Sequence, residues 1–256
     1  MDRREGRIEL LKGVHRWVLN CNWKLCADNF AGDGYHTRLT HASMDMARGR
    51  APSNNSWSGW SGYMGNGHGS TNAPTVTNNP NAGDGGSMIE SEYYRAHQAE
   101  AKARLGEYRA ATGSRGGAST VFPNFSHQVF VRNWHPRGSD KTEVWSYCYF
   151  EKDAPQEVKD AIRMRHTWQM GPSGNQDQDD MNNWAQCTDS GKTFMGKKYP
   201  INQQLGLGRD VQIEGFPGIA NARPSELCQR EYYEFWAQLM EAPSWSQVKL
   251  TPRTVK

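Results

Sequence analysis

The sequence lacks the features that define several large classes of protein. Within its 256 residues, no apolar stretch approaches the ~20 residues that a membrane-spanning helix requires. The charged N-terminal segment MDRREGRIELL is followed by neither an apolar segment nor a cleavage site of small residues, so a secretory signal is not expected. Lys and Arg alternate with Asp and Glu, and the net charge is +3. We therefore expect neither a nucleic-acid-binding nor a membrane-binding surface.

Cysteine is scarce and is not arranged in pairs. The chain has five cysteines, an odd number, and none belongs to a CxxC or CxH motif. This usage is typical of reduced thiols, and it argues against a disulfide framework or a zinc site. The sequence therefore predicts a cytoplasmic protein.

The residues that are abundant indicate a folded chain. Ten Trp, ten Tyr and eight Phe argue against disorder, because disordered chains are poor in aromatic residues. The length suits one large domain better than two. We expect a single domain over residues 1–256, with a Gly-, Asn- and Ser-rich irregular region at about 49–88.

Hydrophobic patterns predict both strands and helices. Residues 8–24 indicate a strand or hairpin, and residues 25–42 a helical segment weakened by two glycines. Within the irregular region, GYMGNGHG is a candidate short strand. Helices are predicted at residues 89–112, 154–169 and about 224–241, and a polar turn at 171–183. Three further strand-like runs are STVFPNFS, HQVFVRNWHP and EVWSYCYFEK. The expected class is α+β, with an antiparallel sheet and separate helices.

A candidate metal site lies in the segment Asn29 to His41, which contains Asp33, His36 and His41. Non-haem iron oxygenases hold Fe(II) with two His and one carboxylate. On an ideal helix, positions five residues apart point about 140° away from each other. The two histidines therefore converge only if the helix is distorted, for example by a local π-type widening, or ends between them. Asp33, three residues before His36, shares its helix face and is able to accept the free ring N–H of a ligating histidine.

This spacing alone does not show that the segment binds a metal, because histidines and acids also gather on helices without one. Three ordered blocks add a resemblance. The first comprises Asn22-Trp23-Lys24, Asp28-Asn29-Phe30, Gly32-Asp33, Tyr35-His36 and His41; the second Gly171-Pro172-Ser173-Gly174 and Asp179-Asp180; the third Phe122-Pro123-Asn124, Trp134-His135-Pro136 and Glu143-Val144-Trp145. Over nearly the whole chain, they resemble the catalytic part of Rieske-type aromatic ring-hydroxylating dioxygenase large subunits, the class that includes naphthalene and biphenyl dioxygenases.

The resemblance implies a role for each matching residue. His36, His41 and Asp180 are the implied ligands of Fe(II). Asp33 is implied to hydrogen-bond His36 and to lead toward the iron–sulfur cluster of a neighbouring subunit. Asn29 is implied to lie near the iron without being a firm ligand.

Weaker assignments concern the surroundings of this site. The candidates for an apolar substrate pocket are Phe30, Thr37, Phe122, Asn124 and Met170, each of which is as readily an ordinary core or loop residue. Asp177 and Asp179 are interpreted as solvated loop acids. The implied fold is a helix-grip (Bet v1-like) domain, in which a curved antiparallel sheet and its covering helices enclose the pocket.

The implied reaction is cis-dihydroxylation of an aromatic hydrocarbon, polycyclic ones included, with O2 and two electrons supplied from outside. The implied partners are other large subunits and a small β subunit in an α3β3-like assembly, with a ferredoxin and reductase as electron donors. One departure from the family is large: a [2Fe–2S] cluster of the Rieske type needs two Cys and two His, and no segment of this sequence supplies them. We therefore expect no self-sufficient turnover.

A non-enzymatic alternative stays open at this point. Helix-grip folds also bind apolar ligands, so the chain is alternatively an inactive ligand-binding or assembly module. A pure binder has no physical need for His36, His41 and Asp180 together, so iron content distinguishes the two interpretations.

Overall fold

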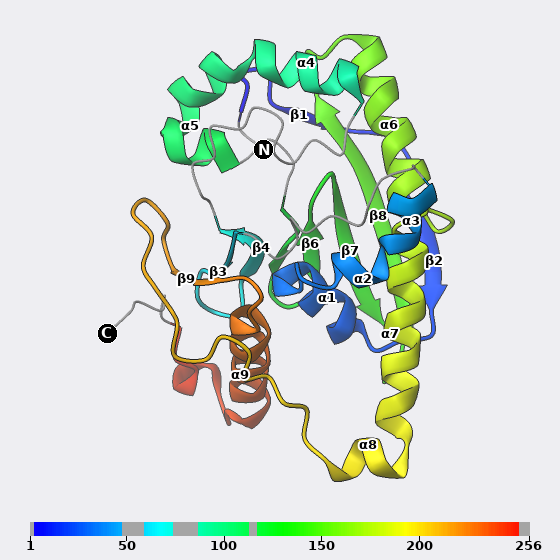
Figure 1. The fold of residues 1–256 in the computed structure, drawn as a ribbon, viewed down its shortest axis with the longest axis vertical. Helices are drawn as coiled ribbons and strands as arrows, with labels where there is room; N and C mark the ends of the chain where they lie inside the picture. Colours follow the sequence, from blue (N-terminus) through cyan, green and yellow to red (C-terminus); the bar gives the residue numbers. More distant parts are fainter. Residues whose placement is uncertain (1–2, 48–58, 74–86, 113–116, 251–256) are drawn as a thin grey trace.

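The structure is a computed structural model, and it describes residues 3–47, 59–73, 87–112 and 117–250. Its centre is an antiparallel nine-stranded sheet in the order β1-β8-β7-β6-β5-β4-β3-β9, with β2 also paired to β8 (Figure 1). The strands are β1 (Ile8–Leu10), β2 (His15–Leu19), β3 (Trp60–Tyr63), β4 (Gly69–Ala73), β5 (Ser119–Val121), β6 (Phe125–His127), β7 (Phe130–Pro136), β8 (Thr142–Glu151) and β9 (Ile219–Ala222).

The N-terminal strands form one interrupted edge of the sheet. β1 and β2 both pair with β8, in the registers Ile8↔Glu151 and His15↔Ser146. The hairpin interpretation of residues 8–24 is therefore wrong, and the strand interpretation holds. The reason is the length of β8, which spans ten residues and has room for two short neighbours in succession.

The irregular region contains more regular structure than its composition suggests. β3 and β4 form an antiparallel hairpin, and β3 also pairs with β9. The candidate strand GYMGNGHG thus spans the end of one strand, a turn and the first residue of the next. β9 is not predicted from the sequence because it is short and is preceded by Gly and Pro. Residues 49–58 and 74–86 of the predicted irregular region lie outside the described residues.

The helices agree with the prediction in part. α6 (Gln156–Met170) and α9 (Leu227–Glu241) confirm two predicted helices. The predicted helix at 89–112 is two helices, α4 (Met88–Ala96) and α5 (Gln98–Thr112), because the backbone departs from helical geometry at His97. The predicted polar turn at 171–183 is wrong beyond residue 176, where α7 (Asp177–Lys192) begins. Three aspartates in its first turn favour that start, since acidic side chains stabilise a helix N-terminus.

Helix α1 (Trp23–Gly32) packs across β4, β5, β6 and β7 and against α9. A hydrogen bond of 2.7 Å from Thr120 Oγ1 on β5 to the carbonyl of Ala27 fixes the helix on the sheet. The main core between them contains Phe30, Phe130, Trp134 and Met170. Helix α6 packs on β8, and α4 packs on α6. The predicted α+β class is confirmed, and the short helix α2 (Thr37–Thr40), which follows α1, lies beside α7 (Figure 1).

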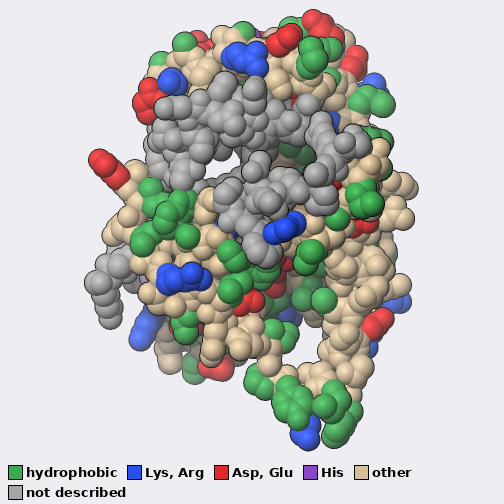
Figure 2. All heavy atoms as spheres, in the orientation of Figure 1, with side chains coloured by type: hydrophobic (Ala, Val, Ile, Leu, Met, Phe, Trp, Pro, Cys, Tyr) green, Lys and Arg blue, Asp and Glu red, His purple; other side chains and the backbone are tan. Residues whose placement is uncertain are grey.

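The far end of α7 and the short helix α8 (Phe194–Lys198) project from the body. Hydrophobic side chains gather on this projecting tip (Figure 2). Four of them are largely exposed: Phe194, Met195, Tyr199 and Ile201. Within the part of the chain that the structure describes, no helix has the length and apolar character needed to cross a bilayer.

Candidate metal centre

The candidate metal centre begins where α1 ends. Asn22 caps the start of α1 by accepting a hydrogen bond of 3.1 Å from the backbone N–H of Lys24. Gly32 ends the helix against α9, and a Cβ at this position would lie 2.4 Å from Cβ of Cys228. Neither of the two glycines that weaken the helix prediction lies inside the helix. Gly32 is its last residue and permits close packing, and Gly34 lies in the turn that follows.

The chain leaves the helix at Asp33 and forms the single-turn helix α2 (Thr37–Thr40) between the two histidines. His36 precedes α2, and His41 follows it with φ −101° and ψ 17°. The helix therefore ends on both sides, which brings the two rings together without a π-type widening. The ring centroids lie 5.3 Å apart, with an angle of 72° between the ring planes.

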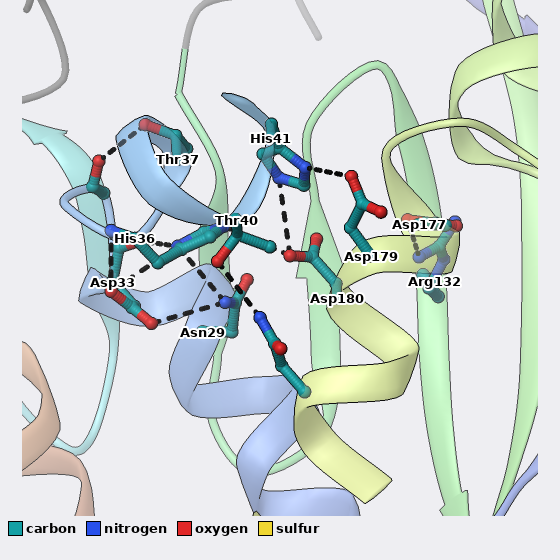
Figure 3. A network of polar contacts seen from close by, with 12 residues as sticks. Asn29, Asp33, His36, Thr37, Thr40, His41, Arg132, Asp177, Asp179 and Asp180 are labelled. Carbon is teal, nitrogen blue, oxygen red and sulfur yellow. Dashed lines mark hydrogen bonds and ion pairs between the residues drawn. The ribbon is translucent and has the colours of Figure 1, made fainter. Parts of the chain in front are cut away.

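The third member, Asp180, comes from the first turn of α7. Its Oδ1 lies 3.2 Å from Nε2 of His36 and 3.4 Å from Nε2 of His41 (Figure 3). One ligand atom from each of the three residues lies within 4.8 Å of the others. Among the described residues, this is the one such group of three or more His, Cys, Asp or Glu side chains. The exposed fractions of the side chains are 17% for His36, 8% for His41 and 10% for Asp180, so the cluster is mostly shielded from water.

The surroundings of each histidine select the nitrogen that is available to a metal. Nδ1 of His36 is in close contact with the backbone carbonyl of Asp33. A carbonyl accepts and does not donate, so in the neutral ring Nδ1 carries the proton and Nε2 is the nitrogen left for a metal. Nδ1 of His41 similarly faces the Asp179 carboxylate at 3.4 Å. Both rings thus present Nε2 toward Asp180.

Asp33 lies on the side of His36 away from Asp180, and Asn29 lies between Asp33 and Asp180 in the view (Figure 3). The Asp33 carboxylate accepts a hydrogen bond of 3.3 Å from the backbone N–H of His36 and lies 3.5 Å from its Nδ1. The nearer partner of that ring nitrogen is the Asp33 carbonyl. Asn29 is buried, with Nδ2 3.4 Å from Nδ1 of His36 and 3.5 Å from Oδ2 of Asp33. Both residues therefore contact His36 on its Nδ1 side.

Two aspartates near Asp180 are not the solvated loop acids that the sequence suggests. Asp177 is buried in an ion pair with Arg132, and Asp179 contacts His41. The interpretation is wrong because the segment is helical from Asp177 onward, and the helix turns these two side chains toward different neighbours. An Arg in the middle of a predicted strand, at position 132, is the one sequence signal for a buried acid partner.

The charges around His36 act on its protonation in opposite directions. Burial lowers the pKa of His36, whereas the hydrogen bonds and charges of Asp180 and Asp33 raise it, and the net pKa lies well above the ordinary value. Nε2 of His36 is buried, and Oδ1 of Asp180 lies 3.2 Å from it. A buried lone pair beside a carboxylate and a second imidazole fits a divalent metal of the iron type, which takes this donor set.

The candidate pocket residues lie in several environments. Phe30 and Met170 are buried in the main core, and Phe122 packs on that core, with its ring centroid 5.2 Å from that of Tyr232. Asn124 donates a hydrogen bond of 3.0 Å to the carbonyl of Trp134. Thr37 donates one of 3.2 Å to the carbonyl of Gly34. A substrate contact for any of these five residues stays a prediction.

The sheet with its covering helices and the two-His, one-carboxylate cluster is the arrangement of a mononuclear non-haem iron domain. Residues 8–242 match the family described as "Ring hydroxylating alpha subunit (catalytic domain)". The chain belongs to this family.

Individual relatives agree with the family match. The chain is 29% identical to the biphenyl dioxygenase subunit alpha of Metapseudomonas furukawaii, over 97% of this chain and 57% of that protein. It is 30% identical to the benzene 1,2-dioxygenase subunit alpha of Pseudomonas putida, over 98% of this chain and 58% of that protein. The crystal structure of naphthalene 1,2-dioxygenase from Rhodococcus sp. bound to indole superposes with a TM-score of 0.78 at 32% identity, over 95% of this chain and 59% of that one. The chain thus spans somewhat more than half the length of these relatives.

Proposed function

We propose that this chain is the oxygen-activating part of an aromatic ring-hydroxylating dioxygenase, with Fe(II) held by His36, His41 and Asp180. The observation that carries the proposal is the approach of these three side chains to within 4.8 Å of one another. They come from two segments of the chain that are far apart in sequence, in a member of this family. Two neutral imidazoles and one carboxylate occupy one face of a metal and leave its other positions for exchangeable ligands.

Fe(II), when bound, supplies the activation of O2 for cis-dihydroxylation of an aromatic ring. The side chains around it have separate tasks. Asp33 and Asp179 hold the Nδ1 sides of His36 and His41, so that Nε2 of each neutral ring is the nitrogen available to the metal. The buried aromatic core next to α1 contains Phe30 and Trp134, whose ring centroids lie 5.5 Å apart. Such surroundings favour a neutral arene over a charged substrate, because burying a charge there is costly.

The source of electrons is part of the proposal. The relatives are named subunits or components of larger systems. We propose that this chain likewise assembles with further large subunits and a small β subunit. Its electrons then come from a ferredoxin and reductase through a [2Fe–2S] cluster held outside these 256 residues. Asp33 is the proposed last protein group on that route, because it touches His36 from the side opposite to Asp180 (Figure 3).

Iron analysis and a peroxide assay together test the proposal. The purified chain, loaded anaerobically with Fe(II), is expected to hold one iron per chain. Hydrogen peroxide carries oxygen already reduced by two electrons, so its two oxygens and two hydrogens can add to an arene without an electron donor. We expect a small yield of cis-diol from naphthalene or biphenyl under these conditions, detected by chromatography.

The Asp180→Ala variant is the matched control, because it removes the carboxylate and leaves both histidines. It is expected to lose the iron and the diol together. A chain that folds, binds an arene and takes up no iron would instead identify a ligand-binding module. Robust turnover with NADH and no Rieske protein would show that the proposed electron route is wrong.

A further inference from the structure

A buried ion pair lies next to the candidate metal centre without belonging to it. Arg132 on β7 and Asp177 at the start of α7 have side chains that are 0% and 1% exposed. Two parallel hydrogen bonds join them, Nη1 to Oδ1 at 3.2 Å and Nη2 to Oδ2 at 2.7 Å. Burying two charges removes their hydration, which is rarely a net gain in stability over apolar side chains of the same size. Stability alone is therefore a weak explanation for this pair.

The guanidinium of Arg132 connects three elements. It donates from Nη2 to the carbonyl of Met170, the last residue of α6, at 2.7 Å. Its Nε donates to Oγ of Ser146 on β8 at 3.3 Å. Its carbon Cζ lies 4.0 Å from the ring centroid of Phe130. One side chain on a central strand thus holds the end of α6 and the start of α7 in fixed positions.

The segment between these two anchor points has little freedom to move. The backbone N–H of Gly174 donates to the carbonyl of Gly171 at 2.8 Å, and that of Gln176 donates to Gln169 at 3.2 Å. A Cβ at Gly174 would lie 2.4 Å from the carbonyl oxygen of Gln169. Because this turn is packed so closely, the Arg132 contacts at its two ends also fix the position of the first turn of α7.

Asp180 lies on that first turn. Positions three residues apart on a helix are separated by about 300°, so Asp177 and Asp180 leave the first turn in directions about 60° apart. Figure 3 shows the Arg132–Asp177 pair on one side of the helix start and Asp180 turned toward the histidines on the other. Any rotation of the first turn therefore moves both carboxylates together.

We infer that Arg132 and Asp177 are positioning residues that set the Asp180 carboxylate against His36 and His41. The pair also neutralises the charge of Asp177, so that this buried carboxylate adds no free negative charge beside the metal position. Neither residue supplies a ligand atom to the cluster. This inference rests on the proposed function, because it concerns the geometry with which the three ligands receive Fe(II).

The test measures Fe(II) affinity by anaerobic competition with a chelator. Asp177→Asn keeps the shape of the side chain and removes its charge, and we expect affinity to fall about 10- to 100-fold, the usual cost of losing a group that orients a metal ligand. The visible absorption of bound Co(II) is a second readout, and we expect its bands to shift because the position of Asp180 changes. Arg132→Lys keeps the charge and loses the two parallel hydrogen bonds. Its Fe(II) affinity is therefore expected to lie between those of the wild type and Asp177→Asn.

A double variant separates positioning from stability. Arg132→Met with Asp177→Leu replaces both charges by apolar groups, a change that often leaves a fold intact or stabilises it. We expect this variant to be folded and still to bind Fe(II) about 10- to 100-fold more weakly. Glu90→Gln is the matched control, because Glu90 on α4 forms a comparably buried pair with Arg165 on α6, at 3.4 Å and with 1% and 7% exposure. It is expected to lose stability and to keep its iron affinity.

The outcomes separate a positioning role of the Arg132–Asp177 pair from an effect on general stability. Wild-type affinity and an unchanged Co(II) spectrum in the double variant would overturn the positioning role. An equal loss of affinity in Glu90→Gln would overturn it as well, because the effect would then be one of general stability. Iron retained by Asp180→Ala would instead contradict the proposed function itself, so the two failures are distinguishable.

Discussion

Oδ2 of Asp179 lies 3.4 Å from Nδ1 of His41, and the other ring nitrogen, Nε2, lies 3.4 Å from Oδ1 of Asp180. Two adjacent residues of α7 thus approach both nitrogens of one imidazole. A carboxylate at Nδ1 fixes the tautomer and raises the basicity of a ligating histidine.

The contact between Asp179 and His41 predicts a moderate effect of mutation. Asp179→Ala is expected to weaken Fe(II) binding about 10- to 100-fold without abolishing it, because the three ligands remain. Chelator competition measures this change. Asp189→Ala is a suitable control, because it removes an exposed acid further along the same helix. Equal affinity in both variants would show that Asp179 has no part in holding His41.

Removal of a ligand is expected to have a larger effect than removal of its support. His36→Ala and His41→Ala should each abolish iron binding and leave a folded protein, since neither ring is among the hydrophobic side chains that form the main core. Metal analysis gives the iron content, and circular dichroism gives the fold. Full iron occupancy in the double variant would contradict the assigned ligands.

Asp33 is expected to affect turnover more than iron content. Asp33→Asn should keep most of the iron, because the nearest partner of Nδ1 in His36 is the backbone carbonyl of Asp33, which the substitution preserves. In a reconstituted system with a Rieske protein, most of the activity should be lost. The measurement is product formation per bound iron. A variant that turns over at the normal rate would show that electrons do not pass by way of Asp33.

Iron affinity is expected to rise with pH. The pKa of His36 is raised well above its ordinary value by Asp180 and Asp33, which outweigh the opposing effect of burial. A proton therefore competes with the metal at His36 even above the ordinary histidine pKa of about 6.5. In the iron-free chain, protonated His36 stabilises the folded state, because its pKa is higher in the folded than in the unfolded chain. This stabilisation is fully present below the unfolded pKa and is lost as pH rises through the folded pKa. Titrations between about pH 6 and pH 8 measure the affinity, and a constant affinity would contradict the expectation.

Asp28 is expected to make the stability of the fold depend on pH. Burial, and then the charge of Asp33, raise the pKa of Asp28 from 3.8 to about 8, against the effect of a hydrogen bond from Tyr233. The folded state therefore binds more protons than the unfolded state between these two values. The free energy of unfolding should fall as pH rises through that range. Urea unfolding at several pH values measures the slope, and Asp28→Asn should remove this contribution because an amide does not titrate.

The sequence by itself pointed to the donor set of the proposed site, through its residue types and a family resemblance, and to several of the elements around it. Residue types and order point to two histidines and a carboxylate. Local propensity predicts α6, α9 and the long strands β7 and β8, because these segments have clear periodicity and sufficient length. The five-residue spacing also implies that a single regular helix does not bring His36 and His41 together, and the structure shows the break at α2.

The tertiary structure alone decided the surroundings of Asp177 and Asp179, which the sequence interpretation left as solvated loop acids next to Asp180. Asp177, Asp179 and Asp180 share a polar sequence that predicts a turn, yet Asp177 pairs with Arg132, whereas Asp179 and Asp180 both contact His41. The difference arises because Arg132, on a strand far away in sequence, fixes the rotation of α7 about its axis. Pairing β3 with β9 likewise depends on partners that are distant in the chain. Local sequence carries little information about such contacts, because long-range packing sets their geometry.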